Sequence, residues 1–517
     1  MAHTIVEYMH EHGGYRCGYC GGSNSNYSHG MWAHSLNSED YQDLVDRGWR
    51  RSGCYLYKPL MDKMCCPCYA IRCAALEFKT TKSQKKVIKK MIRFLRTGER
   101  PSSDPKSSEG STKGEDGADC PGTSEHPAQE KELSKRMTEA AVTIRPNPVS
   151  GNPSSSDDSV QCSQKSDSRA DETDSGLADS HRQAVQQMNS ETPGEESGAA
   201  VKKHPRPGLG ADPTKPPCKK AKELRRQRRL ERLSQAGTDA PPADTKQPDQ
   251  PRSLEKLIQE VESSPQGAKH KLEFKLIRSS PESRQFKETF RESHQLFAKY
   301  QKAIHNEPDD ECQEGDFKRF LVDSPLREEH LPGAPACGYG SFHEHFLLDG
   351  KIIAVGVLDI LPGCISSVYF YYDPDYSFLS LGTYSALREL EFTRRLHLEA
   401  PKINHYYLGF YIHSCIKMRY KGQYHPSFLL CPETYNWCPI EKCRAKLDVS
   451  KYSRLDETDA GDTPVGLQDV RVLHMQMSMM YPDYRRFSPN INDEEEVLEY
   501  AQFVGKTCAG RILLYRN

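Results

Sequence analysis

The sequence predicts an α+β protein with three parts: a small metal-binding N-terminal domain, a long disordered insert, and a larger C-terminal domain of mixed α/β type. Three observations support this prediction: cysteine pairs near the N-terminus, a middle region without aromatic residues, and alternating strand-like and helical runs after it. The expected boundaries are residues 1–100, 101–250 and 251–517.

Two groups of cysteines mark the N-terminal part, Cys17-Gly18-Tyr19-Cys20 and Cys65-Cys66-Pro67-Cys68. A C-x-x-C turn places two thiolates on one side of a tight loop, and a second pair from a distant segment completes a four-ligand metal site. Spacing alone favours Cys17, Cys20, Cys65 and Cys68, while a turn at Pro67 would let Cys66 serve instead. Four thiolates fit zinc or an iron–sulfur cluster equally well.

The rest of the N-terminal part predicts two helices and a strand. Residues 37–48 have a polar N-cap and a closing glycine, residues 55–57 are strand-like, and residues 82–95 carry apolar residues at helical spacing. Between the first helix and the strand, Arg50 and Arg51 stand close to glycines. Paired guanidinium groups suit a carboxylate or a phosphate, although surface arginines beside a helix end are the ordinary alternative.

Cations cluster on the second predicted helix, at Lys85, Lys86, Lys89, Lys90 and Arg93. A second basic run covers residues 219–233, inside a region too rich in Ser, Pro, Gly and charge to bury a core. One basic run is usually a solvated face, and the second could be a nuclear localisation signal. Together the two runs indicate a nucleic-acid partner.

After residue 250 the chain predicts strands at 351–361, 364–372 and 405–411, with a helix at 383–396 before the last strand. Asp373 and Asp375 follow the second strand, and Ser380-Leu381-Gly382 opens the helix. Helix N-termini stabilise anions and developing oxyanions, so this corner is a candidate site. His413, Cys415, Lys417 and Arg419 follow the third strand, where a nucleophilic thiol is disfavoured because no glycine-flanked elbow surrounds Cys415.

Composition limits the compartment. The net charge of −1 says nothing about partners, and the first residues lack the apolar core of a signal peptide. The 18 cysteines are therefore expected to be reduced thiols of a cytoplasmic and nuclear protein. The sequence has no run of about 18 apolar residues, so no membrane span is predicted.

Several separated motifs closely resemble eukaryotic arginyl-tRNA–protein transferases. They are Tyr15 to Cys20, Asp46 to Gly53, Cys65-Cys66-Pro67, Phe317 to Leu321, Cys337 to His343, Tyr371 to Pro374, Ser380 to Gly382 and Gly409 to Cys415. The resemblance implies transfer of arginine from arginyl-tRNA to proteins that begin with Asp, Glu or oxidised Cys. The product would be a degradation signal read by ubiquitin ligases. The C-terminal domain would be GNAT-like, with aminoacyl-tRNA in place of acetyl-coenzyme A.

The resemblance also implies site residues. The family's metal cysteines map onto Cys17, Cys20, Cys65 and Cys66. For the acidic acceptor the candidates are Arg50 and Arg51, then Lys417 and Arg419, and His413 is a further substrate contact. Asp373 and Asp375 would hold the transferred guanidinium, with Asp373 also the candidate proton acceptor, and the basic helix would bind tRNA phosphates.

The ester of an aminoacyl-tRNA is already activated, so neither ATP nor coenzyme A is expected, and a monomer is expected. Two rival functions are a non-catalytic zinc-finger adaptor that binds nucleic acid and a coenzyme A-dependent acetyltransferase. The adaptor leaves the large aromatic-rich C-terminal part unexplained. The acetyltransferase lacks a clear R/Q-x-x-G-x-G/A loop, since residues 377–382 match it only distantly.

Overall fold

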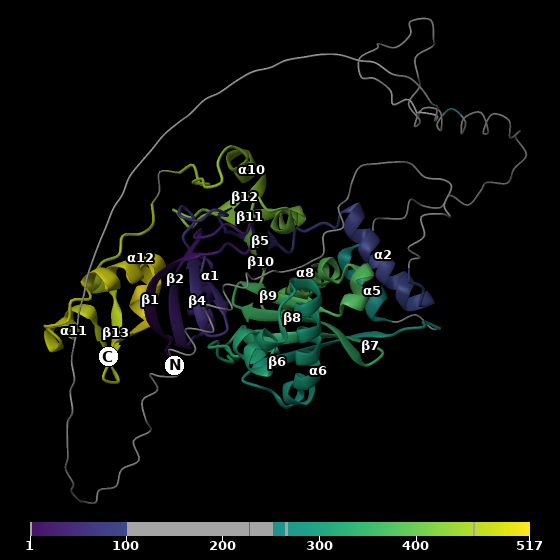
Figure 1. Ribbon diagram of the computed structural model, residues 1–517, viewed down its shortest axis with the longest axis horizontal. Coiled ribbons are helices and arrows are strands. Elements are labelled where there is room, and N and C mark those ends of the chain that lie inside the picture. The colour runs from purple at the N-terminus through teal and green to yellow at the C-terminus, as the bar shows by residue number, and fades with distance from the viewer. Residues whose placement is uncertain (1–2, 101–226, 228–251, 264–266, 459–460, 517) are drawn as a thin grey trace, which may run out of the picture. The chain divides into compact units, whose positions relative to one another are not determined.

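The computed structural model describes residues 3–100, 227, 252–263, 267–458 and 461–516 (Figure 1). Apart from Gln227, these residues belong to one compact unit formed by residues 1–146 and 250–517. The predicted disordered insert and its basic run at 219–233 lie outside the described residues, with Gln227 the exception. Within the described residues, no helix is both long enough and apolar enough to cross a membrane.

The first of two β-sheets has seven strands in the order β14-β13-β15-β1-β2-β4-β3. Two strands far apart in the sequence are neighbours in the middle of this sheet, because Ile5 of β1 pairs in parallel with Leu513 of β15. Its strands are β1 (Ile5–Tyr15), β2 (Asn26–Ser35), β3 (Arg50–Ser52), β4 (Tyr55–Pro59), β13 (Arg471–His474), β14 (Met477–Met480) and β15 (Leu513–Arg516).

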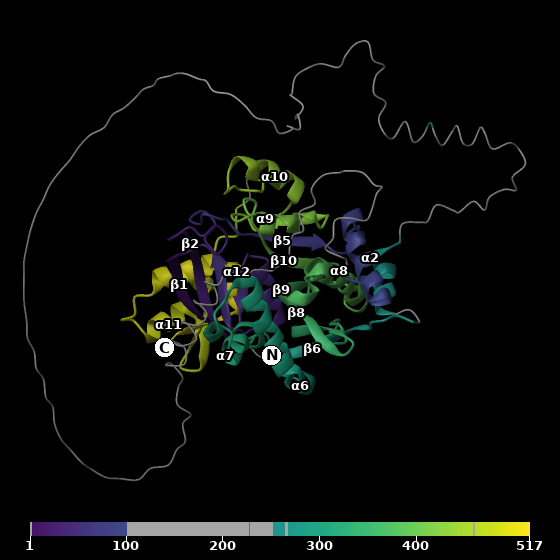
Figure 2. The ribbon, with the colours of Figure 1, turned by 45° about the vertical axis from the view of Figure 1, so that its right-hand side comes forward.

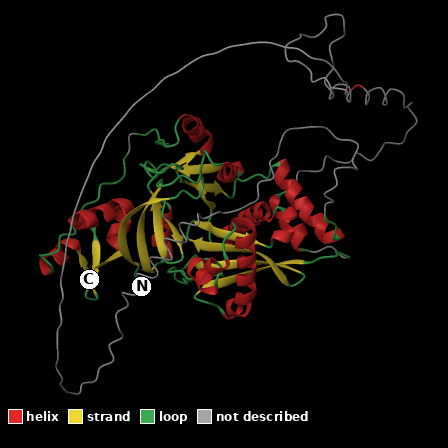
Figure 3. Ribbon diagram, in the orientation of Figure 1, coloured by secondary structure: helices red, strands yellow, loops and turns green. Residues whose placement is uncertain are grey.

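The second sheet has eight strands in the order β12-β11-β5-β10-β9-β8-β7-β6. Figure 3 draws the strands of both sheets in yellow. Its members are β5 (Tyr69–Ala74), β6 (Leu272–Ser280), β7 (Gly340–Leu348), β8 (Lys351–Leu361), β9 (Cys364–Tyr372), β10 (His405–Tyr411), β11 (Ser427–Leu430) and β12 (Trp437–Pro439). All neighbours for which a register is given run antiparallel except β9 and β10.

Helices cover both sheets. They are α1 (Ser38–Val45), α2 (Lys82–Thr97), α5 (Leu254–Glu262), α6 (Arg284–Tyr300), α7 (Glu314–Phe317), α8 (Leu381–Glu399), α9 (Ile416–Arg419), α10 (Ile440–Val449), α11 (Tyr481–Phe487) and α12 (Glu494–Arg511). Short turns of 3-10 helix include η2 (Asp309–Glu311), η4 (Pro374–Leu379), η5 (Tyr420–Gln423) and η6 (Leu467–Asp469), and single π-helical turns are η1 (Gln301–His305) and η3 (Lys318–Val322).

The mixed α/β character, with a cysteine cluster near the N-terminus, is confirmed. The predicted strands 351–361, 364–372 and 405–411 are β8, β9 and β10, and the predicted helix 383–396 lies inside α8. Helix 37–48 is the shorter α1, capped by the Asn37 side chain, which accepts from Asp40 N. The division at residues 100 and 250 stays a prediction, and both sheets draw strands from both sides of it.

Strands β9 and β10 separate part-way along their length, which leaves an opening in the second sheet. The two parallel strands pair only through residues 364–366 and 405–407. Beyond that point β9 has a register shift at Val368, and β10 has one before Phe410, where Gly409 adopts a φ of +71°. Glycine adopts this left-handed conformation without strain. Helix α8 connects the two strands and lies beside them in both views (Figures 1 and 2).

Candidate metal centre and adjoining cationic pocket

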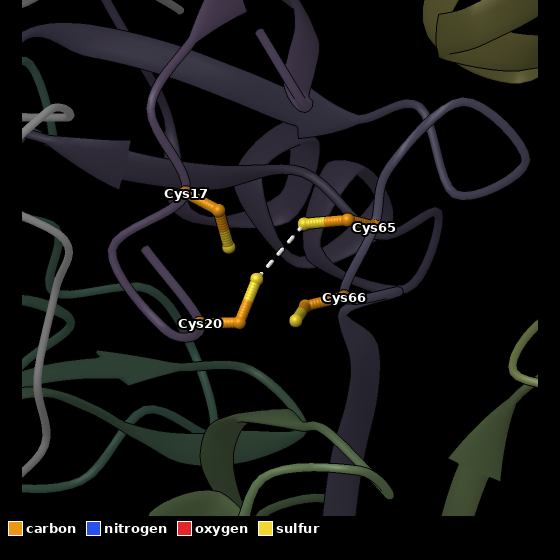
Figure 4. A group of neighbouring side chains, drawn as sticks. All are labelled: Cys17, Cys20, Cys65 and Cys66. Atoms are coloured by element: carbon orange, nitrogen blue, oxygen red, sulfur yellow. Dashed lines mark hydrogen bonds between the residues drawn. The ribbon is translucent and has the colours of Figure 1, made fainter. Parts of the chain in front are cut away.

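Four cysteines come together between the two sheets' loops (Figure 4). Cys17 and Cys20 belong to the loop after β1, and Cys65 and Cys66 to the bend before β5. The four sulfur atoms all lie within 4.8 Å of one another, and the Cys20 and Cys65 sulfurs are 3.3 Å apart. Thiolate sulfurs at such distances can share a metal ion.

The Cys17–Cys20 loop is formed by its own backbone. Cys17 N donates to Gly22 O at 2.7 Å, and Gly21 N donates back to Cys17 O at 2.9 Å. A hydrogen bond from the Gly22 backbone, then one from Cys65, lowers the pKa of Cys20 to about 7. Burial instead raises the pKa of Cys66. A bound cation would offset that burial, because metal coordination favours the thiolate.

Cys66 rather than Cys68 completes the cluster, so the preference from spacing alone is corrected. The Cys68 thiol is buried and donates to Cys66 O at 3.3 Å. Strand alternation does not separate Cys65 from Cys66, because the chain bends at both residues and β5 begins only at Tyr69. The bend therefore lets adjacent cysteines face one metal.

A narrow pocket of about 30 Å³ adjoins the cluster, in the opening between β9 and β10. Its wall includes Tyr19, which stands between Cys17 and Cys20, so the metal loop forms part of the pocket. The full lining is Tyr19, Tyr41, Arg50, Arg51, Ser366, Ser367, Val368, Leu408, Gly409, Phe410, Met418 and Lys421. The space suits a small polar head group.

Arg50 gives this pocket an unsatisfied cationic edge. It lies on β3, is 5% exposed, and donates through one terminal nitrogen to Val45 O and Trp49 O, at 3.0 and 2.7 Å. Its Nε and its second terminal nitrogen have no hydrogen-bond partner among the described residues. Buried donors of this kind are costly unless something binds them, and a carboxylate accepts two parallel N–H bonds.

Arg51 is committed elsewhere. Its Nε and Nη2 donate to the two carboxylate oxygens of Asp359, each at 2.7 Å, and Nη2 also reaches Ser341 Oγ at 3.2 Å. Neither arginine is a surface residue beside a helix end, because both lie in a buried strand. The structure thus separates the two: Arg50 has open donors and Arg51 is half of a buried ion pair.

The structure does not bring the two aspartates to this pocket. Asp373 is buried, and its carboxylate accepts from Lys299 Nζ at 2.5 Å and from Asp375 N at 3.1 Å. Asp375 is exposed, and the same Lys299 amine lies 2.7 Å from it. That hydrogen bond lowers the pKa of Asp375. About six strand residues, or roughly 20 Å, separate Asp373 from Ser367 of the pocket.

The segment after β10 flanks the pocket. His413 contacts Tyr411 OH and the Asp448 carboxylate, each at 2.8 Å, and Arg419 lies 3.9 Å from the same carboxylate. Lys417 and Arg419 belong to α9, which contributes Met418 to the pocket wall. Neither cation lines the pocket itself.

Helix α2 lines a second hollow of about 630 Å³. Lys90 also donates to Phe378 O at 2.9 Å and approaches Ser380 Oγ at 3.4 Å, so α2 contacts the start of α8. Lys85 belongs to the same helix but does not line the hollow. The lining is Lys86, Lys89, Lys90, Arg93, Phe94, Glu99, Arg100 and Phe378.

Three residues near the first pocket escaped sequence reasoning. Lys421 is 5% exposed and lines the pocket, Ser367 lines it from β9, and Glu389 of α8 hydrogen-bonds to Ser367. Glu389 stands one helical turn after Ser385 in a helix that mixes apolar and charged residues, so spacing alone gave no clear signal for it. Nothing local singled out Ser367.

Comparison with known families gives two matching models. The model described as arginine-tRNA-protein transferase, N terminus, matches residues 15–86, and the model described as its C terminus matches residues 292–431. These ranges include the cysteine cluster, Arg50, β9 and β10.

Similar proteins cover more of the chain. Arginyl-tRNA–protein transferase 1 of Drosophila melanogaster is 39% identical over 99% of this chain and 99% of its own length. Its namesake in Arabidopsis thaliana is 35% identical over 90% of this chain and 76% of its own length. A stretch of 92 residues is 45% identical to aspartate/glutamate leucyltransferase of Stutzerimonas stutzeri, covering 18% of this chain and 37% of that relative. Because the Drosophila protein is 39% identical over 99% of both chains, this chain belongs to the arginyl-tRNA–protein transferase family.

Proposed function

We propose that the protein transfers arginine from arginyl-tRNA to the α-amino group of proteins that begin with Asp, Glu or oxidised Cys. The carrying observation is the narrow pocket with Arg50, whose open guanidinium edge is a receptor for one carboxylate or sulfonate group. The bacterial relative's name specifies aspartate and glutamate, which supports an acidic acceptor here as well. The arginylated product would then enter ubiquitin-dependent degradation.

The chemistry needs orientation more than activation. A neutral amine attacks the ester carbonyl of the aminoacyl-tRNA, so no covalent enzyme intermediate, ATP or coenzyme A is required. Arg50 would fix the acidic side chain of the acceptor, and Lys421 adds a second buried cation to the same wall. His413, Lys417 and Arg419 flank the entrance as further acceptor contacts.

For the arginyl group, the expected contacts Asp373 and Asp375 lie too far from the pocket to hold the guanidinium of an arginine transferred there, so we propose that they fix the turn after β9. Both carboxylates pair with Lys299, and their side chains are 3% and 65% exposed. A carboxylate already held in an ion pair is a poor proton acceptor. The ion pair with Lys299 therefore argues against Asp373 as the proton acceptor.

The α2 hollow is our proposed site for tRNA phosphates. Four cations of α2 and Arg100 converge there, and Phe94 and Phe378 supply aromatic faces. Contacts of this kind bind the backbone without reading sequence. Lys85 would add to the field from outside the hollow.

The second sheet is our candidate for the GNAT-like domain, supported by the parallel pair β9 and β10, joined through α8 and open beyond residue 366. The cysteine cluster would hold zinc or an iron–sulfur cluster. Sulfurs within 4.8 Å fit one tetrahedral ion, for which Zn–S bonds of about 2.3 Å place sulfurs roughly 3.8 Å apart. Several irons would require wider separation, and absorption spectra after anaerobic purification distinguish the two. A monomer in the cytoplasm and nucleus completes the proposal.

The test is transfer of radiolabelled arginine from tRNA to peptides that begin with Asp or Asn. Losing a charge-assisted bond to Arg50 amounts to about 1.5–3 kcal/mol, so Asp should exceed Asn by roughly tenfold to a hundredfold. Arg50→Ala should remove most of this preference while tRNA binding stays normal. Preference that survives Arg50→Ala but falls in Arg419→Ala would move the acidic pocket to α9. A wild-type protein that labels no peptide would favour the adaptor function, and one that uses acetyl-coenzyme A would favour the acetyltransferase.

A further inference from the structure

A buried carboxyl lies directly behind the pocket. Glu389 of α8 is 1% exposed, and among the described residues it forms no ion pair. Its carboxyl instead accepts hydrogen bonds from hydroxyl groups: Tyr406 at 2.6 Å, Ser385 one turn earlier, and Ser367. A carboxyl surrounded by hydroxyl donors can take up or release a proton without breaking an ion pair.

Ser367 connects this carboxyl to the pocket. Opposite β8, Leu358 pairs with Ser367 and Val357 pairs with Tyr369, so Val368 is an extra residue in β9. The bulge lets consecutive residues 366–368 all line the pocket. Ser367 therefore belongs to the pocket wall, and its side chain also lies close enough to Glu389 to lower the pKa of that carboxyl.

The sheet leaves room for Glu389 at one glycine. A Cβ placed on Gly356 of β8 would lie 3.4 Å from Glu389 Oε1 and 3.9 Å from Ser385 Oγ. A larger side chain at residue 356 would press on the carboxyl. Gly356 thus leaves open the space beside the Glu389 carboxyl.

Titratable groups reach Glu389 from each packed element. They are Tyr406 on β10, Glu344 on β7 and Tyr424 after η5. The adjacent Arg388 is occupied by Glu344 at 2.9 Å and by Glu262. Burial, then hydrogen bonds and the Glu344 charge, set the pKa of Glu389 at about 7, so both protonation states are populated near neutral pH.

We propose that Glu389 is the final acceptor of a proton from the attacking α-amine, and that the Ser367 hydroxyl relays it. This inference rests on the proposed arginyl transfer. The acceptor ammonium loses two protons overall as the N–C bond forms and the ester C–O bond breaks. One proton passes through Ser367 to Glu389 and later to solvent, and the other ends on the leaving ribose oxygen. Ser367 touches the amine, and Glu389 acts through Ser367.

The experiment measures single-turnover transfer from arginyl-tRNA to an Asp-initiated peptide, from about pH 5.5 to about pH 8.5. Glu389→Gln keeps size and hydrogen bonding but cannot ionise. Its rate above neutral pH should fall by about a hundredfold or more, and the inflection near pH 7 should vanish. Ser367→Ala should lose as much, and the double variant should lose no more, because both substitutions break one path.

Glu391→Gln is the matched control, since it makes the same change on the same helix. Glu391 pairs with Arg395 at 3.0 Å and does not line the pocket. It should keep both the rate and the pH profile. The acceptor amine titrates near pH 8 in every variant, so differences between variants isolate Glu389.

Binding and folding readouts separate the relay from a packing role. Glu389→Gln should keep the Kd for arginyl-tRNA and the metal content, and should melt no lower than wild type, while it loses rate. Retention of the wild-type rate, or a lower rate with the inflection intact, overturns the relay. If Glu389→Gln fails to fold, Ser367→Ala decides by the same criteria. If the wild-type chain transfers no arginine at any pH, the proposed function falls, whereas failure of the relay alone leaves wild-type transfer intact.

Discussion

Arg51 and Asp359 form an ion pair with side chains 1% and 0% exposed. Among the described residues, Arg51→Ala would leave Asp359 as a buried charge with Ser341, at 2.7 Å, as its one remaining side-chain donor. Removing one partner of such a pair destabilises a fold by about 3–5 kcal/mol. Urea unfolding should show this loss in Arg51→Ala. The double variant Arg51→Met, Asp359→Leu should recover most of it, and a single variant as stable as wild type would contradict the prediction.

Glu389 predicts a pH-dependent stability. Burial raises its pKa from 4.5 to about 7, so the folded state holds its proton more tightly than the unfolded state. The stabilisation from this proton is complete below about pH 4.5 and is lost as the pH rises through about 7. Glu389→Gln stays neutral and should be more stable than wild type by about 3 kcal/mol at pH 8, but not at pH 4. Equal unfolding free energies at both pH values would contradict this.

Helix α2 presents its cations in two groups. Lys86 and Lys89 line the hollow. Lys79, just before the helix, and Lys82, its first residue, are also exposed but do not line the hollow. The double variant Lys86→Ala, Lys89→Ala should raise the apparent dissociation constant for arginyl-tRNA. The slope of log affinity against log salt concentration should fall by about 2, one for each lost phosphate contact. Lys79→Ala with Lys82→Ala carries the same charge change and should affect tRNA binding much less.

The apparent dissociation constant for the acceptor peptide is the control for both double variants. If it rises as much as the constant for tRNA, the hollow has another role. Equal effects of the two double variants would instead mean that overall charge, rather than the hollow, attracts tRNA.

Elements with local signals were predictable from the sequence. Turns at Asp349-Gly350 and a long apolar run fixed β8, and the N-cap at Asn37 fixed the start of α1. Contacts between residues far apart in the sequence were not predictable, because they depend on which strands become neighbours. The 308 residues between Arg51 and Asp359, and the insertion of β5 beside β10, carry no local signature. For the same reason Arg50 and Arg51 looked alike in sequence and differ in the structure.

The cysteine cluster connects the two sheets of the whole molecule. Cys17 follows β1 of the first sheet, and Cys66 precedes β5 of the second. Cys17→Ser should therefore lower metal content, reduce stability and distort the pocket through Tyr19, because metal-binding free energy contributes to folding. Metal analysis and thermal unfolding measure both effects. Cys68→Ser is the control and should keep full metal content. Metal loss in Cys68→Ser but not in Cys66→Ser would make Cys68 the fourth ligand.

The parallel pairing of β1 with β15 governs how the chain can be made. Ile5 leaves the ribosome long before its partner Leu513 is made. At about 5–20 residues per second, translation keeps β1 without this neighbour for tens of seconds. During that time β2 can pair with β1, but the other edge of β1 stays available to other chains. The first sheet therefore closes only once residue 513 has been made, and a chain cut short before that residue carries an open edge at β1.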